Sequence, residues 1–598
     1  MKRSAGIITF SLHAVCFIGL AVVSWRKWPD PLVDFGRELY VPWQITQGKV
    51  LHQDINSLFG PLSPYLNALW MRAFGVSLMT LAWCNMAILA VTLAAIHRLI
   101  RECTDRFTAS WATLVALVLC GFSQYLEIGN YNFVTPYSHE ATHGFAFSVL
   151  TLAVVQHAMR TRRPVFGAAA GLAFGLSLLT KPELPLAVAG ALCIGFAAFA
   201  VAEPSNRSRL FRTLLWFAVT TLLPPTLFFA YFRTRMDSLS AADAVVGAWI
   251  SAFNSAVVRN QFYVVGMGAD APAFNTLLVC GTFLVIAGFI AVIALLSTRE
   301  QQPWSASGVL RRIATIALVA LVPVAQLLPL ALALPLIVLL TLSMTAVTFW
   351  KSRRNHDRAI PLIGLMMWCS FALLLLAKIA LNARLSHYGF YLALPAVTVT
   401  VILLCWVLPE HFESWEARII RRKFRWRMSL VLAASILPPF GLSYWWYSTK
   451  TQPIGVGNDR FYVSELTRRQ EYRLVPRALE ELARRTKPGD TVAVLPEGVM
   501  LNYLLRLESP LHVLILMPPE ILTFGEADVV EALEAAPPTM IVFVHKDTSE
   551  YGYPLFGTSG DYGAATMDWI RKRYHPVQVI GTDPMNRSGY GLVIFEKT

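Results

Sequence analysis

The chain has 598 residues, of which 55% are hydrophobic and 15% are charged, and its formal net charge is +14. A mean hydropathy of +0.51 excludes an ordinary water-soluble globule, because so much apolar surface needs lipid to cover it. The positive residues stand in short clusters between apolar stretches and do not cover one soluble face, so we expect no nucleic-acid partner.

Apolar stretches long enough to cross a ~30 Å hydrocarbon core recur from the N-terminus to Tyr447. We expect about thirteen membrane-spanning helices of roughly 20 residues each. Their predicted ranges are 7–25, 78–97, 107–123, 141–158, 165–180, 184–202, 211–232, 273–296, 313–328, 330–349, 360–381, 388–408 and 428–447. A cleaved signal peptide is the alternative for the first span, but no Ala-x-Ala site precedes Trp25.

Lysine and arginine residues fall on one side of the membrane if these spans alternate in direction, and short cytoplasmic loops retain such residues. The clusters are Lys2 and Arg3; Arg98, Arg101 and Arg106; Arg160, Arg162 and Arg163; Arg207, Arg209 and Arg212; Arg299, Arg311 and Arg312; Lys351, Arg353, Arg354 and Arg358; and Arg418, Arg421, Arg422, Lys423, Arg425 and Arg427. We therefore expect a multi-pass protein of the cytoplasmic (inner) membrane with a cytoplasmic N-terminus.

Residues 448–598 are more charged than residues 1–447, and we expect them to form a separate extracytoplasmic α/β domain. Short apolar runs predict strands at 491–495, 512–516, 540–545, 577–580 and 592–596, and an amphipathic helix is predicted at 464–485. Polar stretches at 495–498 and 545–552 follow two of these strands, where α/β sheets often place ligand loops. Acceptor capture, a lid over the membrane site and plain turns are the alternatives for them.

Ionisable residues near a bilayer are costly unless they face water, a partner or a substrate, and here they cluster in the predicted outer loops. The first outer loop, residues 26–77, contains Asp34, Arg37 and Asp54. Residues that we single out in the later outer loops are Tyr131, Tyr137, His139, His143, Lys181, Arg384, His387 and Tyr388.

The segments Asp34-x-Gly36, Gly48 to Asp54 and Gly60-Pro61-Leu62-x-Pro64-Tyr65 resemble the first outer loop of the GT-C glycosyltransferases. Lys181-Pro182-Glu183 and the segment from Arg384 through Tyr388 to Leu394-Pro395 are similar to later parts of that group. Within it, the chain most resembles bacterial relatives of the protein O-mannosyltransferases and aminoarabinose transferases, glycosyltransferase family 39. It departs from the aminoarabinose transferases at Phe59-Gly60-Pro61, where those often have Lys-Pro-Pro.

The resemblance implies a GT-C-like membrane all-α fold and transfer of a sugar from a polyprenyl-phosphate donor to a glycan, lipid or protein acceptor outside the membrane. A glycosyl phosphate carries its own leaving group, so the enzyme needs a base for the acceptor hydroxyl and cations for the departing phosphate. Asp34 is the expected general base. The structural alternative is a loop carboxylate that forms an ion pair with Arg37.

We expect phosphate contact from Arg384, because a guanidinium can bind two phosphate oxygens while keeping its charge. Lys181, His387, Tyr388 and Arg37 are the expected supporting residues at the donor. The alternative for Arg384 and Lys181 is snorkelling at the membrane interface, with Glu183 neutralising Lys181.

Asp54 is expected to bind a divalent metal ion or to orient the acceptor, and a simple turn residue is the alternative. Tyr131 and Tyr137 are expected to stack on a sugar ring or prenyl chain, with interfacial aromatic anchoring as the alternative. His139 and His143, four residues apart, would share a helix face and could belong to a metal site, although this spacing alone is weak support.

Two other classes of function remain as alternatives. A transporter or flippase for a lipid-linked sugar would also need many spans, but the first-loop motif has no repeat in the second half of the chain. A noncatalytic scaffold that binds proteins through residues 448–598 would make the pattern of Asp34 and Arg384 incidental.

Overall fold

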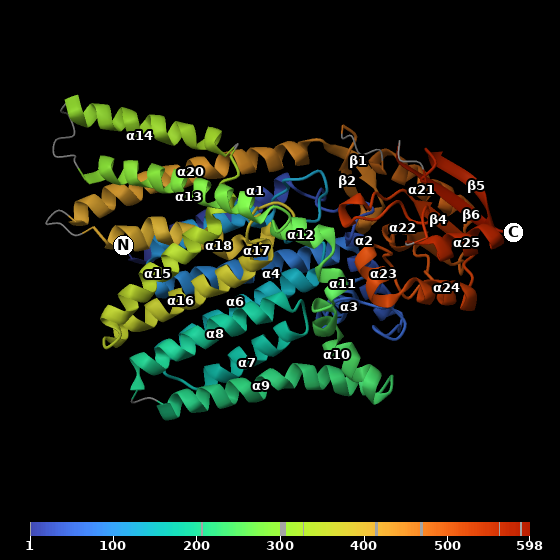
Figure 1. Ribbon diagram of the computed structural model, residues 1–598, viewed down its shortest axis with the longest axis horizontal. Helices are drawn as coiled ribbons and strands as arrows, with labels where there is room; N and C mark the ends of the chain where they lie inside the picture. The colour runs from blue at the N-terminus through green and yellow to red at the C-terminus, as the bar shows by residue number, and fades with distance from the viewer. Residues whose placement is uncertain are drawn as a thin grey trace.

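The computed structural model of the protein describes residues 2–204, 207–298, 306–326, 328–412, 417–466, 471–560, 562–585 and 589–598. Long helices lie side by side over most of its length, and a small sheet with short helices forms the end that carries the C-terminus (Figure 1). Arg299 and residues 467–470, which belong to two of the sequence predictions, lie outside the described residues.

Each predicted span coincides with helix in the structure. The helices concerned are α1 (Lys2–Val23), α4 (Leu78–Cys103), α5 (Arg106–Ala116), α6 (His139–Thr161), α7 (Val165–Leu178), α8 (Glu183–Ala202), α9 (Arg207–Arg233), α13 (Pro272–Thr298), α14 (Ala306–Ala325), α15 (Leu334–Ser352), α16 (His356–Leu376), α17 (Gly389–Leu392), α18 (Leu394–Ile402), α19 (Leu408–Glu410) and α20 (Ala417–Ser448). The expectation of a multi-pass, mainly helical membrane protein is confirmed.

Within the described ranges, ten helices are long and apolar enough to cross a membrane, against the thirteen spans predicted. Three of the predicted spans are shorter apolar helices, at Thr9–Val23, Arg106–Gly121 and Val165–Leu178. Helix α6 belongs to neither group, and its sequence carries polar residues at both ends, among them His139, Glu140 and Gln156. One of the ten, Ser238–Val258, falls in a segment predicted as an outer loop.

Several short helices lie between the long helices and the sheet in Figure 1. They are α2 (Phe35–Thr46), α3 (Leu62–Phe74), α10 (Ser238–Ala252), α11 (Ser255–Val258) and α12 (Gln261–Met267). Helices α2 and α3 come from the first outer loop and pack against each other. This layer carries Asp34 at the start of α2.

The C-terminal end contains two sheets. Strands β1 (Lys450–Ile454) and β2 (Phe461–Ser464) form an antiparallel pair, and β3 (Val492–Leu495), β4 (Met540–Val544), β5 (Tyr574–Gly581) and β6 (Gly591–Lys597) form a sheet of order β3-β4-β6-β5. Strands β3 and β4 run parallel, whereas β6 is antiparallel to both β4 and β5. The accompanying helices are α21 (Glu471–Arg485), α22 (Met500–Leu505), α23 (Pro518–Phe524), α24 (Glu526–Ala535) and α25 (Ala564–Arg573). A C-terminal α/β part is therefore confirmed.

The strand predicted at 512–516 is wrong, although its residues are apolar. Its backbone hydrogen bonds go to loops: the His512 carbonyl accepts from Asn56 N–H at 2.8 Å, and Leu516 N–H donates to the Pro496 carbonyl at 2.7 Å. After Met517, Pro518 and Pro519 start α23. An apolar run thus serves here as a buried connection, which periodicity alone does not distinguish from a strand.

The C-terminal part rests on α2. A Cβ atom at Gly36 would lie 2.4 Å from the backbone nitrogen of Met500, so the backbones of α2 and α22 touch. The Tyr40 hydroxyl accepts a hydrogen bond from Ser509 N–H at 2.7 Å, and the Trp43 and Tyr503 rings pack edge to face. These contacts join residues 448–598 to α2. The predicted domain boundary between residues 447 and 448 therefore stays a prediction.

The contact at Gly36 generates the first prediction. The substitution Gly36→Ala places a methyl group against Met500 backbone atoms that have no side-chain freedom to move away. We expect a loss of about 1–3 kcal/mol in unfolding free energy, measured by thermal denaturation in detergent.

The matched control is Gly19→Ala in α1, where the same Cβ atom would meet no heavy atom within 4 Å. This control should leave the stability unchanged or slightly raised, because Ala favours the helix. Equal stability of the Gly36 variant and the control would contradict the close approach of α2 and α22.

Candidate active site

Asp34 occupies the N-cap position of α2, but its side chain does not cap the helix. Its φ of 55° and ψ of −59° lie in a region that non-glycine residues rarely adopt, so surrounding contacts must hold it there. The backbone N–H of Asp34 donates to Glu497 Oε1 at 3.0 Å. Glu497, which follows β3, therefore fixes this turn from the C-terminal part.

A second aspartate shapes the same loop. Asp30 is buried, and its carboxylate accepts hydrogen bonds from the backbone N–H groups of Leu32 and Val33 and from the Tyr472 hydroxyl. Loop aspartates commonly bond to the backbone two or three residues ahead in this way. Asp30, and not Asp34, therefore makes the side-chain hydrogen bonds that stabilise this loop.

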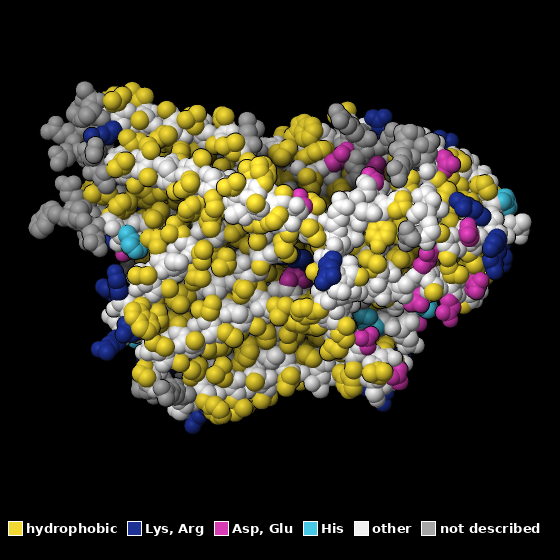
Figure 2. Space-filling model, in the orientation of Figure 1, with side chains coloured by type: hydrophobic (Ala, Val, Ile, Leu, Met, Phe, Trp, Pro, Cys, Tyr) yellow, Lys and Arg dark blue, Asp and Glu magenta, His cyan; other side chains and the backbone are white. Residues whose placement is uncertain are grey.

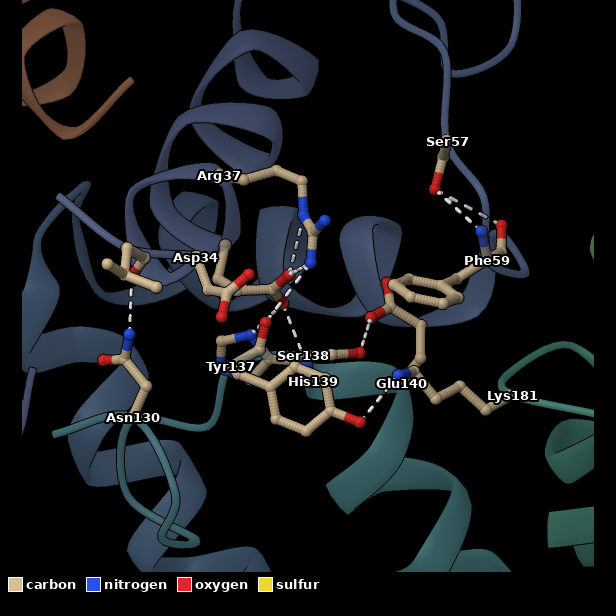
Figure 3. Close-up of polar contacts among 12 residues, drawn as sticks. Asp34, Arg37, Ser57, Phe59, Asn130, Tyr137, Ser138, His139, Glu140 and Lys181 are labelled. Atoms are coloured by element: carbon tan, nitrogen blue, oxygen red, sulfur yellow. Dashed lines mark hydrogen bonds and ion pairs between the residues drawn. The ribbon is translucent and has the colours of Figure 1, made fainter. Parts of the chain in front are cut away.

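The Asp34 carboxylate accepts no hydrogen bond and joins no ion pair with any residue that the structure describes, and no dashed line reaches it in Figure 3. Burial, followed by the negative charge of Glu497, raises the pKa of Asp34 to about 7, while Arg37 and Lys546 oppose the rise. A half-buried carboxylate with such a pKa can accept a proton near neutral pH.

Arg37 pairs with Glu38 and not with Asp34, so the ion pair considered from the sequence is not formed. Its Nε and Nη2 atoms donate to Glu38 Oε1 at 3.2 and 3.0 Å. Glu38 Oε2 accepts from the backbone N–H of His139 at 2.8 Å and lies 2.7 Å from Nδ1 of the same residue. Burial works against the charged form, but His139 and Arg37 outweigh it and lower the pKa of Glu38 to about 2.

Both ring nitrogens of His139 contact neighbouring side chains. Its Nδ1 faces Glu38, and its Nε2 lies 2.8 Å from the amide nitrogen of Asn85, which can only donate. With both nitrogens in use, His139 has no free atom for the metal pair considered with His143.

Lys181 is buried beside the same loop. Its Nζ donates to the Tyr137 hydroxyl at 2.8 Å and lies 4.0 Å from the centre of the Phe59 ring (Figure 3). Burial lowers the pKa of Lys181 to about 8. Glu183 forms an ion pair with Lys378 at 2.9 Å, and its charge also acts on Lys181. Lys181 is buried and does not snorkel.

The predicted aromatic residues meet in one cluster. Tyr131 and Tyr137 are buried, with ring centres 5.9 Å apart, and Tyr388 lies 4.7 Å from Tyr137. Phe262 of α12 stacks on Tyr551 at 4.7 Å and brings the C-terminal part to the edge of this cluster. These tyrosines therefore pack against each other beside Lys181 and do not form a row of separate interfacial anchors.

Arg384 and His387 lie beside that cluster. Arg384 is half-buried and makes no hydrogen bond or ion pair within the described part of the chain, and burial lowers its pKa. The His387 ring lies 4.5 Å from that of Tyr131. Burial, with Arg384 and Lys181 nearby, lowers the pKa of His387 to about 3, so His387 is neutral and supplies no positive charge.

Asp54 closes a tight turn. Its Oδ2 accepts from Val50 N–H at 2.7 Å, and its own N–H donates to the Val50 carbonyl at 2.9 Å. Among the described residues, no group of three or more His, Cys, Asp or Glu side chains is placed to hold a metal ion. The residues around Asp54 thus do not form a ligand set, and a metal there stays a prediction.

Three residues of the C-terminal part complete the site. Glu497 forms an ion pair with Lys546, which follows β4, and burial raises the pKa of Glu520 on α23 to about 8. None of the three was predicted as a site residue from the sequence. Glu497 and Lys546 nevertheless stand in the two polar stretches that follow neighbouring parallel strands, which was the available signal.

Comparisons with known proteins bear on the family and the fold of the chain. Residues 59–232 match the family described as dolichyl-phosphate-mannose-protein mannosyltransferase. No curated protein matches the chain. The crystal structure of the Archaeoglobus fulgidus oligosaccharyltransferase complex with zinc and sulfate is 14% identical, with a TM-score of 0.51 over 90% of this chain and 68% of that chain.

The crystal structure of ArnT from Cupriavidus metallidurans bound to undecaprenyl phosphate is 12% identical. Its TM-score is 0.46 over 99% of this chain and 98% of that chain. The expected resemblance to the GT-C glycosyltransferases is confirmed by the family match and by the archaeal fold. The family match over residues 59–232 points to a glycosyl-transferring enzyme.

The buried pair of Glu38 and His139 generates the second prediction. The substitution Glu38→Ala leaves Arg37 and His139 without their partner, and removing one member of a buried ion pair costs about 3–5 kcal/mol. We expect a clearly lower melting temperature in detergent than for the wild type.

The control is Glu410→Ala, because Glu410 pairs with Arg421 at an exposed position. Exposed pairs contribute little, so this variant should melt as the wild type does. If the Glu38 variant melts together with the Glu410 variant, the pair does not hold α2 to α6.

Proposed function

We propose that the protein is an integral-membrane glycosyltransferase that moves a sugar from a polyprenyl-phosphate-linked donor to an acceptor on the outer side of the cytoplasmic membrane. The observation that carries the proposal is the Asp34 carboxylate, which has no partner among the described residues and whose pKa burial raises to about 7 near Arg37 and Lys546. The match of residues 59–232 to the mannosyltransferase family and the GT-C fold support it.

Asp34 acts as the general base in this proposal. Its carboxylate takes the proton from the acceptor hydroxyl while that oxygen forms a bond to the anomeric carbon of the sugar. The bond between the anomeric carbon and the phosphate oxygen breaks, and the electron pair leaves with the phosphate. No metal is needed to balance this step, and none is used in it.

The departing phosphate gains negative charge, which Arg384 and Lys181 stabilise. Arg384 has no carboxylate partner among the described residues, so its guanidinium is available to a phosphate. Lys181 is held by Tyr137 and supplies a second positive charge while it is protonated. Arg37 adds a third positive charge, and its ion pair with Glu38 holds it in place. Such preorganised charges favour the transition state.

Tyr131, Tyr137 and Tyr388 supply an aromatic surface between Asp34 and Arg384. Aromatic faces suit the apolar side of a sugar ring or the first unit of a prenyl chain. The Phe262 and Tyr551 stack covers the edge of this surface from the C-terminal part. We therefore place the donor between the cations and the tyrosines, and the acceptor on the Asp34 side.

The distribution of charge supports an orientation with the N-terminus in the cytoplasm and residues after 447 outside. In Figure 2, Lys and Arg side chains gather at the end of the helices near the N-terminus and again on the C-terminal part, with an apolar belt between them. The belt is the region that lipid would cover. Asp34 and its neighbours lie where the belt meets the C-terminal part, which suits a lipid-linked donor.

The third prediction concerns the base. Asp34→Asn keeps the size of the side chain but cannot accept the proton, so transfer should fall by about 10²–10⁴-fold. The measurement is mass spectrometry of lipid-linked saccharides and envelope glycans in a strain in which the variant replaces the wild-type protein. The donor should accumulate, and the variant should be as abundant as the wild type.

Asp237→Asn is the control, since Asp237 is an exposed N-cap aspartate of α10. This variant should restore transfer. Full transfer by the Asp34 variant would remove Asp34 as the base, and donor trapped on the cytoplasmic leaflet in the strain lacking the chain would favour a flippase.

The fourth prediction concerns the pH dependence of the transfer rate of the purified protein. The base must be deprotonated, so the rate should rise with pH through about 7, the pKa to which burial and Glu497 raise Asp34. Lys181 must be protonated, so the rate should fall with pH through about 8, the pKa to which burial lowers Lys181. A narrow bell-shaped profile is expected.

Glu497→Gln removes a negative charge that raises the pKa of Asp34 and should move the acid side of this profile to lower pH. The alkaline side should stay in place. Glu410→Gln is the control and should keep both sides. An acid side that stays or moves to higher pH in the Glu497 variant would contradict the role of Glu497.

A further inference from the structure

Phe59 is an aromatic residue of the first outer loop that the proposed reaction does not use. It belongs to Phe59-Gly60-Pro61, the segment at which the chain departs from the aminoarabinose transferases. Its side chain is half-buried, and its ring points into the space between Arg37 and Lys181 (Figure 3). The ring therefore faces two of the cations that the proposed function assigns to the departing phosphate.

Phe59 lies close enough to both cations for cation–π interactions. Lys181 Nζ is 4.0 Å from the centre of the Phe59 ring, and Arg37 Cζ is 5.5 Å from the same centre. A cation within about 6 Å of a ring centre is attracted by the negative face of the ring, and more strongly where water is excluded. Lys181 is the nearer and the more buried cation, so it gains most from the ring.

The backbone around Gly60 brings this ring to Lys181. Gly60 N–H donates to the Thr180 carbonyl at 3.3 Å, and Leu62 N–H donates to the Leu179 carbonyl at 3.1 Å. A Cβ atom at Gly60 would lie 2.3 Å from the Leu179 carbonyl oxygen, so only glycine permits this approach. The residue before Gly60 is thus held against the turn that carries Lys181.

The ring supplies Lys181 with a contact that its polar neighbours do not. An ammonium group has three N–H donors, and within the described ranges Lys181 Nζ makes one hydrogen bond, to the Tyr137 hydroxyl at 2.8 Å. A buried ammonium group is costly to keep charged unless other groups stabilise it. The Phe59 ring provides part of this stabilisation and leaves an N–H for a ligand.

No carboxylate of the described residues forms an ion pair with Lys181. Glu183 pairs with Lys378 at 2.9 Å, and Glu140 accepts a hydrogen bond from the Ser138 hydroxyl at 2.6 Å. Burial lowers the pKa of Lys181 to about 8, so a change in one contact alters how much of it is charged near neutral pH. The titratable groups that surround Lys181 are Glu183, Lys378, Glu140, Arg37 and His387.

We propose that Phe59 is a positioning residue whose ring holds the Lys181 ammonium group toward the donor phosphate and favours its protonated form. A cation held in this way keeps an N–H for a phosphate oxygen and does not have to be reorganised as the phosphate departs. The importance of this contact for catalysis rests on the proposed function. The contact itself can be measured without sugar transfer, so the two can fail separately.

The experiment follows the titration of Lys181 by NMR in the full chain, labelled with ¹³C at the lysine Cε atoms and purified in detergent. The signal of Lys181 is the one missing from Lys181→Arg, and in the wild type its midpoint should lie near pH 8. Phe59→Leu keeps an apolar side chain but removes the ring face, so the midpoint should fall by about 0.5–1.5 pH units. Phe59→Met, a second replacement without a ring, should give the same shift.

Phe59→Tyr is the conservative variant, because it keeps the ring face, and its midpoint should match that of the wild type. Phe107→Leu is the matched control, since the Phe107 ring lies 4.5 Å from Arg425 Cζ in another part of the chain. This control removes a cation–π contact without touching Lys181 and should leave the midpoint in place. Size-exclusion chromatography shows which variants are folded.

Two outcomes would overturn the proposal. One is a midpoint in the Leu and Met variants of Phe59 that equals or exceeds that of the wild type. The other is an equal shift in Phe59→Tyr and Phe59→Leu, since that would reflect packing alone.

The transfer rate separates this inference from the proposed function. Where Phe59→Leu lowers the midpoint of Lys181, the alkaline side of the pH–rate profile should move to lower pH by the same amount. A lowered midpoint with an alkaline side that stays in place would support the contact between Phe59 and Lys181 and contradict the role of Lys181 in transfer.

Discussion

The hydrogen bond from Asp34 N–H to Glu497 joins two parts of the chain that are 463 residues apart. It holds Asp34 in an unfavourable backbone conformation at the start of α2, and the contact of Gly36 with Met500 keeps the two backbones together there. Because Asp30 makes the hydrogen bonds that shape the loop, the Asp34 carboxylate stays without a partner among the described residues. The arrangement of the candidate site depends on this junction.

Asp34 and Glu38 are neighbouring carboxylates whose surroundings shift their pKa values in opposite directions. Glu38 and Asp34 both lie at the beginning of α2, but His139 and Arg37 bind Glu38 and keep it charged, whereas burial and Glu497 raise the pKa of Asp34 to about 7. Two acids with pKa values pushed apart are typical of sites that hold charge at one residue and move a proton at the other. In the proposed function, Glu38 positions Arg37 and Asp34 exchanges the proton.

The helices could be predicted because about 20 consecutive apolar residues have few alternatives to a membrane span. Residues 512–516 were misassigned because a short apolar run reads the same in a strand and in a buried connection. Motifs singled out Asp34, Lys181 and Arg384 as candidates. The partner of Arg37 could not be predicted, since Asp34 and Glu38 are both within reach of it in sequence. Glu497 and Lys546 were noticed only as loop residues, because nothing local reveals contacts with α2.

The most direct measurement of this account is the protonation of Asp34 itself. Infrared difference spectra of the wild type against Asp34→Asn, with ¹³C-labelled aspartate, isolate the band of this one carboxyl group as pH is varied. The account predicts that the protonated band disappears with a midpoint near pH 7, the pKa to which burial and Glu497 raise it. A midpoint near the ordinary aspartate value of about 4 would contradict it.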